Sequence, residues 1–281
     1  MITWPYTLTA GHSANPADGA CAMDAVNWLA HGKHGDVPVC ACPTISSFVR
    51  QGNDAMPEDV RQRLLPYLHR IAGSRSLDHE AARVHVLWLA AVRVFTPLGL
   101  DGAGLHGMAD RLRTLPDDVP ASVANTAAKA ALRSGLKATE VARIAWLKSG
   151  APSPSERDAF RIWRAADGAA TAAAAAVWAI ESAMSAAKAF ELGDIATREE
   201  ISEVRSSSAR GSAKSARAVA EIADVSDATE GRQAAWDPYF ATLDAALSAG
   251  PQGEPWSADV LHMADDRYRA AGGLVTGEAR S

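Results

Sequence analysis

The residues that could carry out chemistry gather near the start of the chain, in residues 19–75. All three cysteines fall here, interleaved with histidines. Thiolate sulfur and imidazole nitrogen are the ligands that zinc prefers. The side chains that could hold zinc are Cys21, His34, Cys40 and Cys42, with His31 beside them. Cys40 and Cys42 are closer in sequence than the usual two-residue gap of a zinc site, so the pattern indicates candidates and not a complete motif.

A second interpretation of the same segment is catalytic. A histidine beside carboxylates can act as a general acid or base, and a nearby cysteine could serve as nucleophile. The candidate residues are Asp24, His34, Asp36, Asn53 and Asp54, with Arg50 beside them. Nothing in their spacing forces these side chains together, and no third catalytic partner is identifiable.

Two further interpretations involve neither zinc nor a catalytic histidine. A thiol-redox pair would join Cys21 to Cys40 or Cys42, and it would need an exposed thiol with a lowered pKa. In the structural interpretation the cysteines are small buried apolar residues, the polar side chains bind loop amides, and Arg50 pairs with Asp54. We favour the structural interpretation over the other three.

Helices must position this segment, and their signals are clear around it. Residues 1–18 contain proline and glycine and are typical of a short extended lead-in. Apolar side chains at helical spacing predict helices over residues 19–30, 44–51 and 57–72. Pro66 should kink the last of these, because proline removes a backbone donor and clashes with the preceding turn.

Further helices follow, separated by punctuation in the sequence. A well-buried helix is predicted over residues 79–95, and Pro97 and Gly99 should end it. Residues 121–134 are alanine-rich and predict one helix, and Thr139 opens another.

The clearest break is Gly-Ala-Pro-Ser-Pro at residues 150–154. It predicts two domains, residues 1–150 with the Cys/His segment and residues 151–281 with alanine-rich helices. The second begins with one long helix over residues 156–192, and Thr197 starts the next with a capping box. We therefore expect an all-α fold, an irregular multi-helix bundle of roughly eleven helices without strands.

Composition and charge narrow the function classes. The chain has 281 residues, 48% of them hydrophobic, so it can bury a sizeable core. A net charge of −5 argues against a dedicated nucleic-acid binder. A local contact with nucleic acid could involve only the basic group Arg205, Arg210, Lys214 and Arg217. No motif for an organic cofactor is found, and zinc is the one ion for which the sequence offers candidate ligands.

The expected location is the cytoplasm. No run of 18 apolar residues is present, which argues against a membrane-spanning helix. The first residues carry no basic and apolar leader typical of secretion.

The Cys/His segment resembles a family of uncharacterised bacterial and phage-encoded helical proteins. The motifs that carry the resemblance are Cys21-x-Met23-Asp24-Ala25-Val26-x-Trp28, His34-x-Asp36-x-Pro38-x-Cys40-x-Cys42-Pro43 and Arg50-x-x-Asn53-Asp54. It covers residues 19–115 well and the remainder only in composition. The resemblance implies a helical fold with an alanine-rich second half, and it carries over no activity.

Helical surfaces without a complete catalytic constellation favour an interaction protein. We expect it to bind another macromolecule, a protein partner above all, with a phage or mobile-element association. The alternative is an enzyme or metalloprotein whose site is built on residues 21–54. The sequence leaves open whether the protein is an enzyme.

Overall fold

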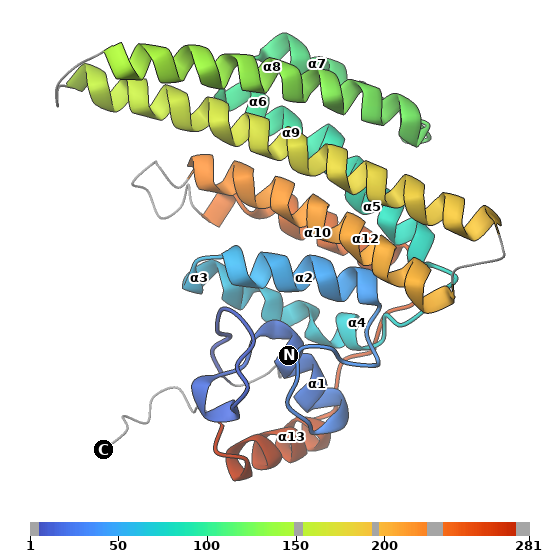
Figure 1. Cartoon of the computed structure of the whole chain (residues 1–281). Helices are drawn as coiled ribbons and strands as arrows, with labels where there is room; N and C mark the ends of the chain where they lie inside the picture. Colours follow the sequence, from blue (N-terminus) through green and yellow to red (C-terminus); the bar gives the residue numbers. More distant parts are fainter. Residues whose placement is uncertain (1–5, 149–153, 193–196, 224–232, 274–281) are drawn as a thin grey trace. The chain divides into compact units, whose positions relative to one another are not determined.

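The structure is a computed structural model that describes residues 6–148, 154–192, 197–223 and 233–273 (Figure 1). Within these ranges the regular structure is helical. The only β-type pairing among them is an isolated parallel bridge between Leu8 and Ala20. The predicted all-α fold is confirmed.

Contacts within the chain divide it into two compact units. Unit 1 comprises residues 1–83 and 243–281, and unit 2 comprises residues 84–242. Unit 1 is thus built from both ends of the chain. Residues 149–153, where the sequence predicts a boundary, lie outside the described residues. The predicted domains, residues 1–150 and 151–281, do not coincide with these units.

Unit 1 is made of short helices around α1. Its helices are η1 (Pro16–Asp18), α1 (Ala22–His31), α2 (Pro43–Ala55), α3 (Glu58–Arg61), η2 (Gln62–Tyr67), α4 (Leu68–Ala72) and α13 (Ala258–Ala270). Pro66 lies in η2, a 3-10 segment between α3 and α4, so the proline interrupts the helix where the sequence predicts a kink. α1 packs against α2, α4 and α13, which places it at the centre of the unit.

A buried arginine links the two chain segments that form unit 1, residues 1–83 and 243–281. Arg83 lies in α5 (Glu80–Ala90), and its side chain is fully buried. Its guanidinium donates to the carbonyl of Ser74 and, at 2.7 Å, to the carbonyl of Pro251. A Cβ on Gly250 would lie 2.8 Å from Arg83 Nη2, so glycine leaves room for the cation. Charge-assisted hydrogen bonds therefore hold the C-terminal segment in this unit.

Unit 2 is dominated by three long helices. It contains most of α5, then η3 (Ala91–Phe95), α6 (Thr96–Gly102), α7 (His106–Arg113), α8 (Ala121–Lys148), α9 (Pro154–Leu192), α10 (Arg198–Ala223) and the start of α12 (Asp237–Ser248). α8, α9 and α10 lie side by side as consecutive antiparallel helices, with α9 in the middle (Figure 1). η3 and α6 pack against α9 and α10. The long helix predicted from the sequence is confirmed as α9.

The capping box predicted at Thr197 is also confirmed. The Thr197 N–H donates to Glu200 Oε2 at 2.5 Å, and the Glu200 N–H donates to Thr197 Oγ1 at 3.2 Å. These reciprocal bonds satisfy two backbone donors at the start of α10. α10 then continues through the polar residues 205–217 as one helix.

Close packing against α9 depends on residues with little or no side chain. Most alanines of α9 between residues 165 and 179 are buried. Three helices each bring a glycine against the α9 backbone, namely Gly99 of α6, Gly135 of α8 and Gly211 of α10. A Cβ at any of them would lie 3.1 Å or less from a backbone atom of α9. The composition of small residues thus sets the distance between the helices.

Two predicted helix breaks are wrong, and the first is at Pro97. One helix continues from Glu80 to Gly102, with Ala91–Phe95 in π geometry. Proline has no N–H to give to the preceding turn, and a π segment is one way for a helix to absorb that loss. The Thr96 hydroxyl donates to the Ala91 carbonyl at 2.7 Å and so satisfies an acceptor in the widened turn.

The second wrong break lies between residues 134 and 139. α8 is a single helix from Ala121 to Lys148. Gly135 has low helix propensity, but it lies where α8 approaches Ala170 of α9 most closely. Tertiary packing therefore outweighs local propensity at this position.

Two helical stretches are apolar and long enough to cross a membrane by length and composition. They are Glu80–Gly102 and Ala159–Glu191, and 56% of the most apolar 18-residue window in each is buried within the structure. Core helices of soluble proteins pass the same test. The expectation that no helix spans a membrane stays a prediction.

A pair of glycine substitutions tests the close approach of α8 to α9. We expect Gly135→Ala to lower the free energy of unfolding by about 1–3 kcal/mol, because the new Cβ would meet the Ala170 backbone at 2.9 Å. The control is Gly107→Ala in α7, where nothing lies within 4 Å of the new Cβ. That change should stabilise the protein by about 0.5–1 kcal/mol. Chemical denaturation measures both, and equal effects would contradict the packing described.

Candidate functional site

The N-terminal segment of unit 1 is fixed by hydrogen bonds to α2 and η2. Leu8 is fully buried, its N–H donates to Gln62 Oε1 at 2.8 Å, and its carbonyl accepts from Gln62 Nε2 at 3.1 Å. The carbonyl of Thr9 accepts from Asn53 Nδ2 at 2.9 Å. These bonds set the path of the chain and therefore the position of His12, three residues further on.

Asp24, in the first turn of α1, is fully buried. Its Oδ2 accepts the N–H of Cys21 at 3.1 Å, and its own N–H donates to Cys21 Sγ at 3.4 Å, which completes a capping box. The positive end of the helix dipole stabilises the carboxylate here. The second oxygen, Oδ1, lies 2.9 Å from His12 Nδ1. Since an ionised carboxylate can only accept, His12 donates from Nδ1.

His34 lies in the turn that follows α1. Gly32 ends the helix in the left-handed region, at φ 62°, and so reverses the chain direction. Trp28 Nε1 donates to His34 Nδ1 at 3.2 Å, so Nδ1 carries the lone pair and Nε2 carries the proton. His34 Nε2 then donates to the carbonyl of Ser13, the residue next to His12.

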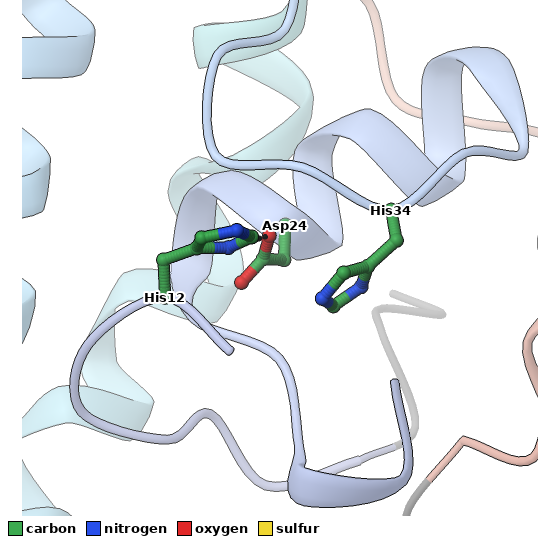
Figure 2. Close-up of side chains that lie close together, drawn as sticks. All are labelled: His12, Asp24 and His34. Carbon is green, nitrogen blue, oxygen red and sulfur yellow. Dashed lines mark hydrogen bonds and ion pairs between the residues drawn. The ribbon is translucent and has the colours of Figure 1, made fainter. Parts of the chain in front are cut away.

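These three side chains form one cluster, which Figure 2 shows. His12, Asp24 and His34 each offer one atom that could bind a metal ion, and these three atoms lie within 4.8 Å of one another. The two imidazole rings stack with centroids 5.3 Å apart and an angle of 30° between planes. The His12 side chain is 39% exposed and that of Asp24 is fully buried, so the cluster has a buried floor and an accessible side. It is the only such group of three metal-ligating side chains in the described part of the chain.

The structure brings together two of the predicted catalytic candidates, Asp24 and His34. Asp36 instead forms an ion pair with Arg50, Nη1 to Oδ2 at 3.3 Å. Arg50 therefore takes Asp36 as its partner, and not Asp54 as the sequence interpretation had it. His31 is the last residue of α1 and does not belong to the cluster.

The other two candidates, Asn53 and Asp54, hold the N-terminal segment in place. Asn53 is fully buried and accepts the N–H of Ala22 at 3.1 Å, besides its bond to the segment. Asp54 Oδ1 accepts the N–H of Gly11 at 2.8 Å. Both residues thus hold the segment that carries His12, and the amide that Asn53 binds is that of Ala22, the first residue of α1.

The three thiols do not join His34. All of them are free, with Cys21 and Cys42 buried and Cys40 half-buried. Cys42 precedes α2, and its N–H donates to Ser74 Oγ at 2.9 Å. Among the described residues, the zinc set predicted from the sequence is therefore not assembled.

Burial also makes Cys21 and Cys40 poorer nucleophiles and ligands. Desolvation, and then the charge of Asp24, raise the pKa of Cys21 far above its usual value. Burial raises the pKa of Cys40 as well. The thiolate is the form that attacks electrophiles and binds metals, and the raised pKa values of Cys21 and Cys40 disfavour that form.

Sequence reasoning missed His12. It lies in the extended lead-in, where no helical periodicity indicates which way a side chain points. The signal that could have found it is indirect. Asn53 and Asp54, two polar residues of α2, both bind backbone groups of the segment that carries His12.

Three basic side chains of α10 interact with side chains close to them in the structure. Arg210 lies 3.1 Å from Glu203, and Arg217 lies 2.6 Å from Glu221. The Lys214 ammonium sits 4.7 Å from the centre of the Trp178 ring. These contacts partly neutralise the charge that a nucleic acid would need, and binding through Arg205 and its neighbours stays a prediction.

Comparison of the chain with known protein families, curated proteins and solved structures gives no match. The resemblance to a bacterial and phage-encoded family therefore stays a prediction.

Thiol labelling tests the burial of the cysteines. In native protein at neutral pH we expect iodoacetamide to modify Cys40 first, because it is the only one of the three that is not buried. Cys21 should react only on unfolding, since burial and Asp24 keep its thiol protonated. Peptide mass spectrometry over time measures the order. Labelling of Cys21 as fast as Cys40 would contradict the geometry.

Proposed function

We propose that the protein is a metalloprotein that binds one divalent transition-metal ion through His12, Asp24 and His34. The observation that carries the proposal is the convergence of two imidazoles and a carboxylate, from three separate segments, to within 4.8 Å. The site lies partly within the segment from which the sequence predicts the alternative function. It uses imidazole and carboxylate in place of thiolate.

The donor chemistry selects the class of ion. Calcium and magnesium prefer oxygen ligands, and this cluster offers only one carboxylate. Two imidazoles with a carboxylate suit zinc and its first-row neighbours. A cation would also balance the buried charge of Asp24, whose other oxygen is already held by the α1 amide of Cys21.

The number of protein ligands bears on what the ion would do. Structural zinc sites are closed by four protein ligands, whereas catalytic sites have three and keep a position for water or substrate. Three ligands and the half-exposed ring of His12 fit the second type. An ion there would be able to activate a water molecule for hydrolysis, and we propose metal-assisted hydrolysis as the reaction class.

Metal titration of matched variants tests the proposal. Zinc binding, measured by calorimetry, and cobalt binding, followed by visible absorption, should both be found in the wild type. We expect His12→Ala and Asp24→Asn each to weaken zinc binding by about 100-fold or more. His106→Ala is the control, because His106 makes an equal 2.9 Å contact with Asp101 but belongs to no group of three ligating side chains among the described residues.

Two results would contradict the proposal. One is a wild type that binds neither ion. The other is a His12→Ala variant that stays folded by circular dichroism and binds zinc as tightly as the His106→Ala variant. In either case the cluster serves only to hold the N-terminal segment on α1.

Binding of another macromolecule, the other predicted function, stays a prediction. Exposed apolar side chains on α8, among them Val141, Ile144 and Leu147, are compatible with it. Nothing in the structure identifies what would cover them. The predicted phage association and cytoplasmic location likewise stay predictions.

A further inference from the structure

We propose that Trp28 regulates the metal site by competing with the ion for the lone pair of His34. This inference rests on the proposed function. The indole Nε1–H donates to His34 Nδ1 at 3.2 Å, so the one lone pair of the neutral imidazole is already engaged. An ion can bind His34 only by taking that lone pair.

The competition does not depend on which ring nitrogen binds the ion. If Nδ1 is the ligand, the ion displaces the indole directly. If Nε2 is the ligand, the imidazole proton moves to Nδ1, which then has no lone pair to offer. In both cases the Trp28 N–H loses its acceptor, and in the second the Ser13 carbonyl loses its donor as well.

Burial gives this loss a measurable effect. Trp28 is only 5% exposed, so its freed N–H has little access to water. A buried donor left without an acceptor is unfavourable by about the value of a hydrogen bond or more. The wild-type affinity should therefore be lower than the ligand set alone would give, and the indole sets that affinity.

Trp28 also connects the site to the C-terminal helix of unit 1. Its ring meets that of Tyr268 in α13 edge to face, with centroids 5.5 Å apart. Tyr268 is fully buried, and its hydroxyl donates to the Pro16 carbonyl at 3.1 Å. Pro16 belongs to the same N-terminal segment as His12. A movement of the indole on metal binding would therefore act on contacts with both α13 and the N-terminal segment.

Two measurements test the inference, the first on the wild-type protein. The chain has eight tryptophans, and 15N labelling of the indoles gives one N–H resonance for each. Trp28→Phe identifies the signal of Trp28. We expect zinc to shift that signal and to speed its exchange with water, and to leave the indole of Trp88, in unit 2, unmoved.

The second measurement is zinc affinity. Trp28→Phe removes the competing donor and keeps an aromatic ring against Tyr268, so we expect zinc to bind about two- to tenfold tighter. Trp88→Phe is the control. Trp88 is similarly buried, at 4% exposure, and its ring also lies against a histidine, with the centroids of Trp88 and His85 4.8 Å apart. Its zinc affinity should equal that of the wild type.

The outcomes separate this inference from the proposed function. Zinc binding by the wild type with an unmoved Trp28 signal, and an unchanged or weaker affinity in Trp28→Phe, would overturn the inference alone. Weaker binding would identify the indole as a group that positions the His34 ring. Absence of zinc binding by the wild type would overturn both.

Discussion

The site depends on the buried carboxylate of Asp24. Each of its two oxygens has its own hydrogen-bond partner. One accepts the N–H of Cys21 at the start of α1, and the other accepts from His12. A carboxylate out of contact with water is unfavourable unless it is hydrogen-bonded or paired. The helix N-terminus supplies part of that stabilisation, and the N-terminal segment, by way of His12, supplies the rest.

The same requirement explains how unit 1 is assembled around α1. The segment that carries His12 has no helix of its own beyond one 3-10 turn, and it is held by side chains of α2 and η2. His34 comes from the turn after α1 and reaches the same place because Gly32 reverses the chain. Polar side chains of α2 and η2 therefore help to place His12, and the left-handed Gly32 helps to place His34.

Much of the fold could be predicted from the sequence, because its signals are local. The long helix α9 follows from alanine content, and the start of α10 follows from a capping box at Thr197. The predictions of a helix end at Pro97 and of a break between residues 134 and 139 were wrong, because a helix can accommodate a proline and close packing can outweigh the low helix propensity of a glycine. A π segment absorbs the proline, and contact with the α9 backbone requires the glycine.

The site itself could be predicted only in part. Asp24 and His34 lie in a motif-like segment and were identified by residue type. His12 lies in an irregular stretch, where sequence gives no direction for a side chain. The sequence shows that the cysteines could act as ligands or nucleophiles, but it does not show their burial, which raises the pKa of Cys21 and so makes it unreactive.

The central claim is that an ion in this protein is held by imidazole and carboxylate and not by thiolate. X-ray absorption at the zinc edge of the zinc-loaded protein tests it most directly. The account predicts a first shell of nitrogen and oxygen at about 2.0–2.1 Å, with outer-shell scattering from two imidazole rings. A sulfur neighbour at about 2.3 Å would contradict it and would return the site to the cysteines.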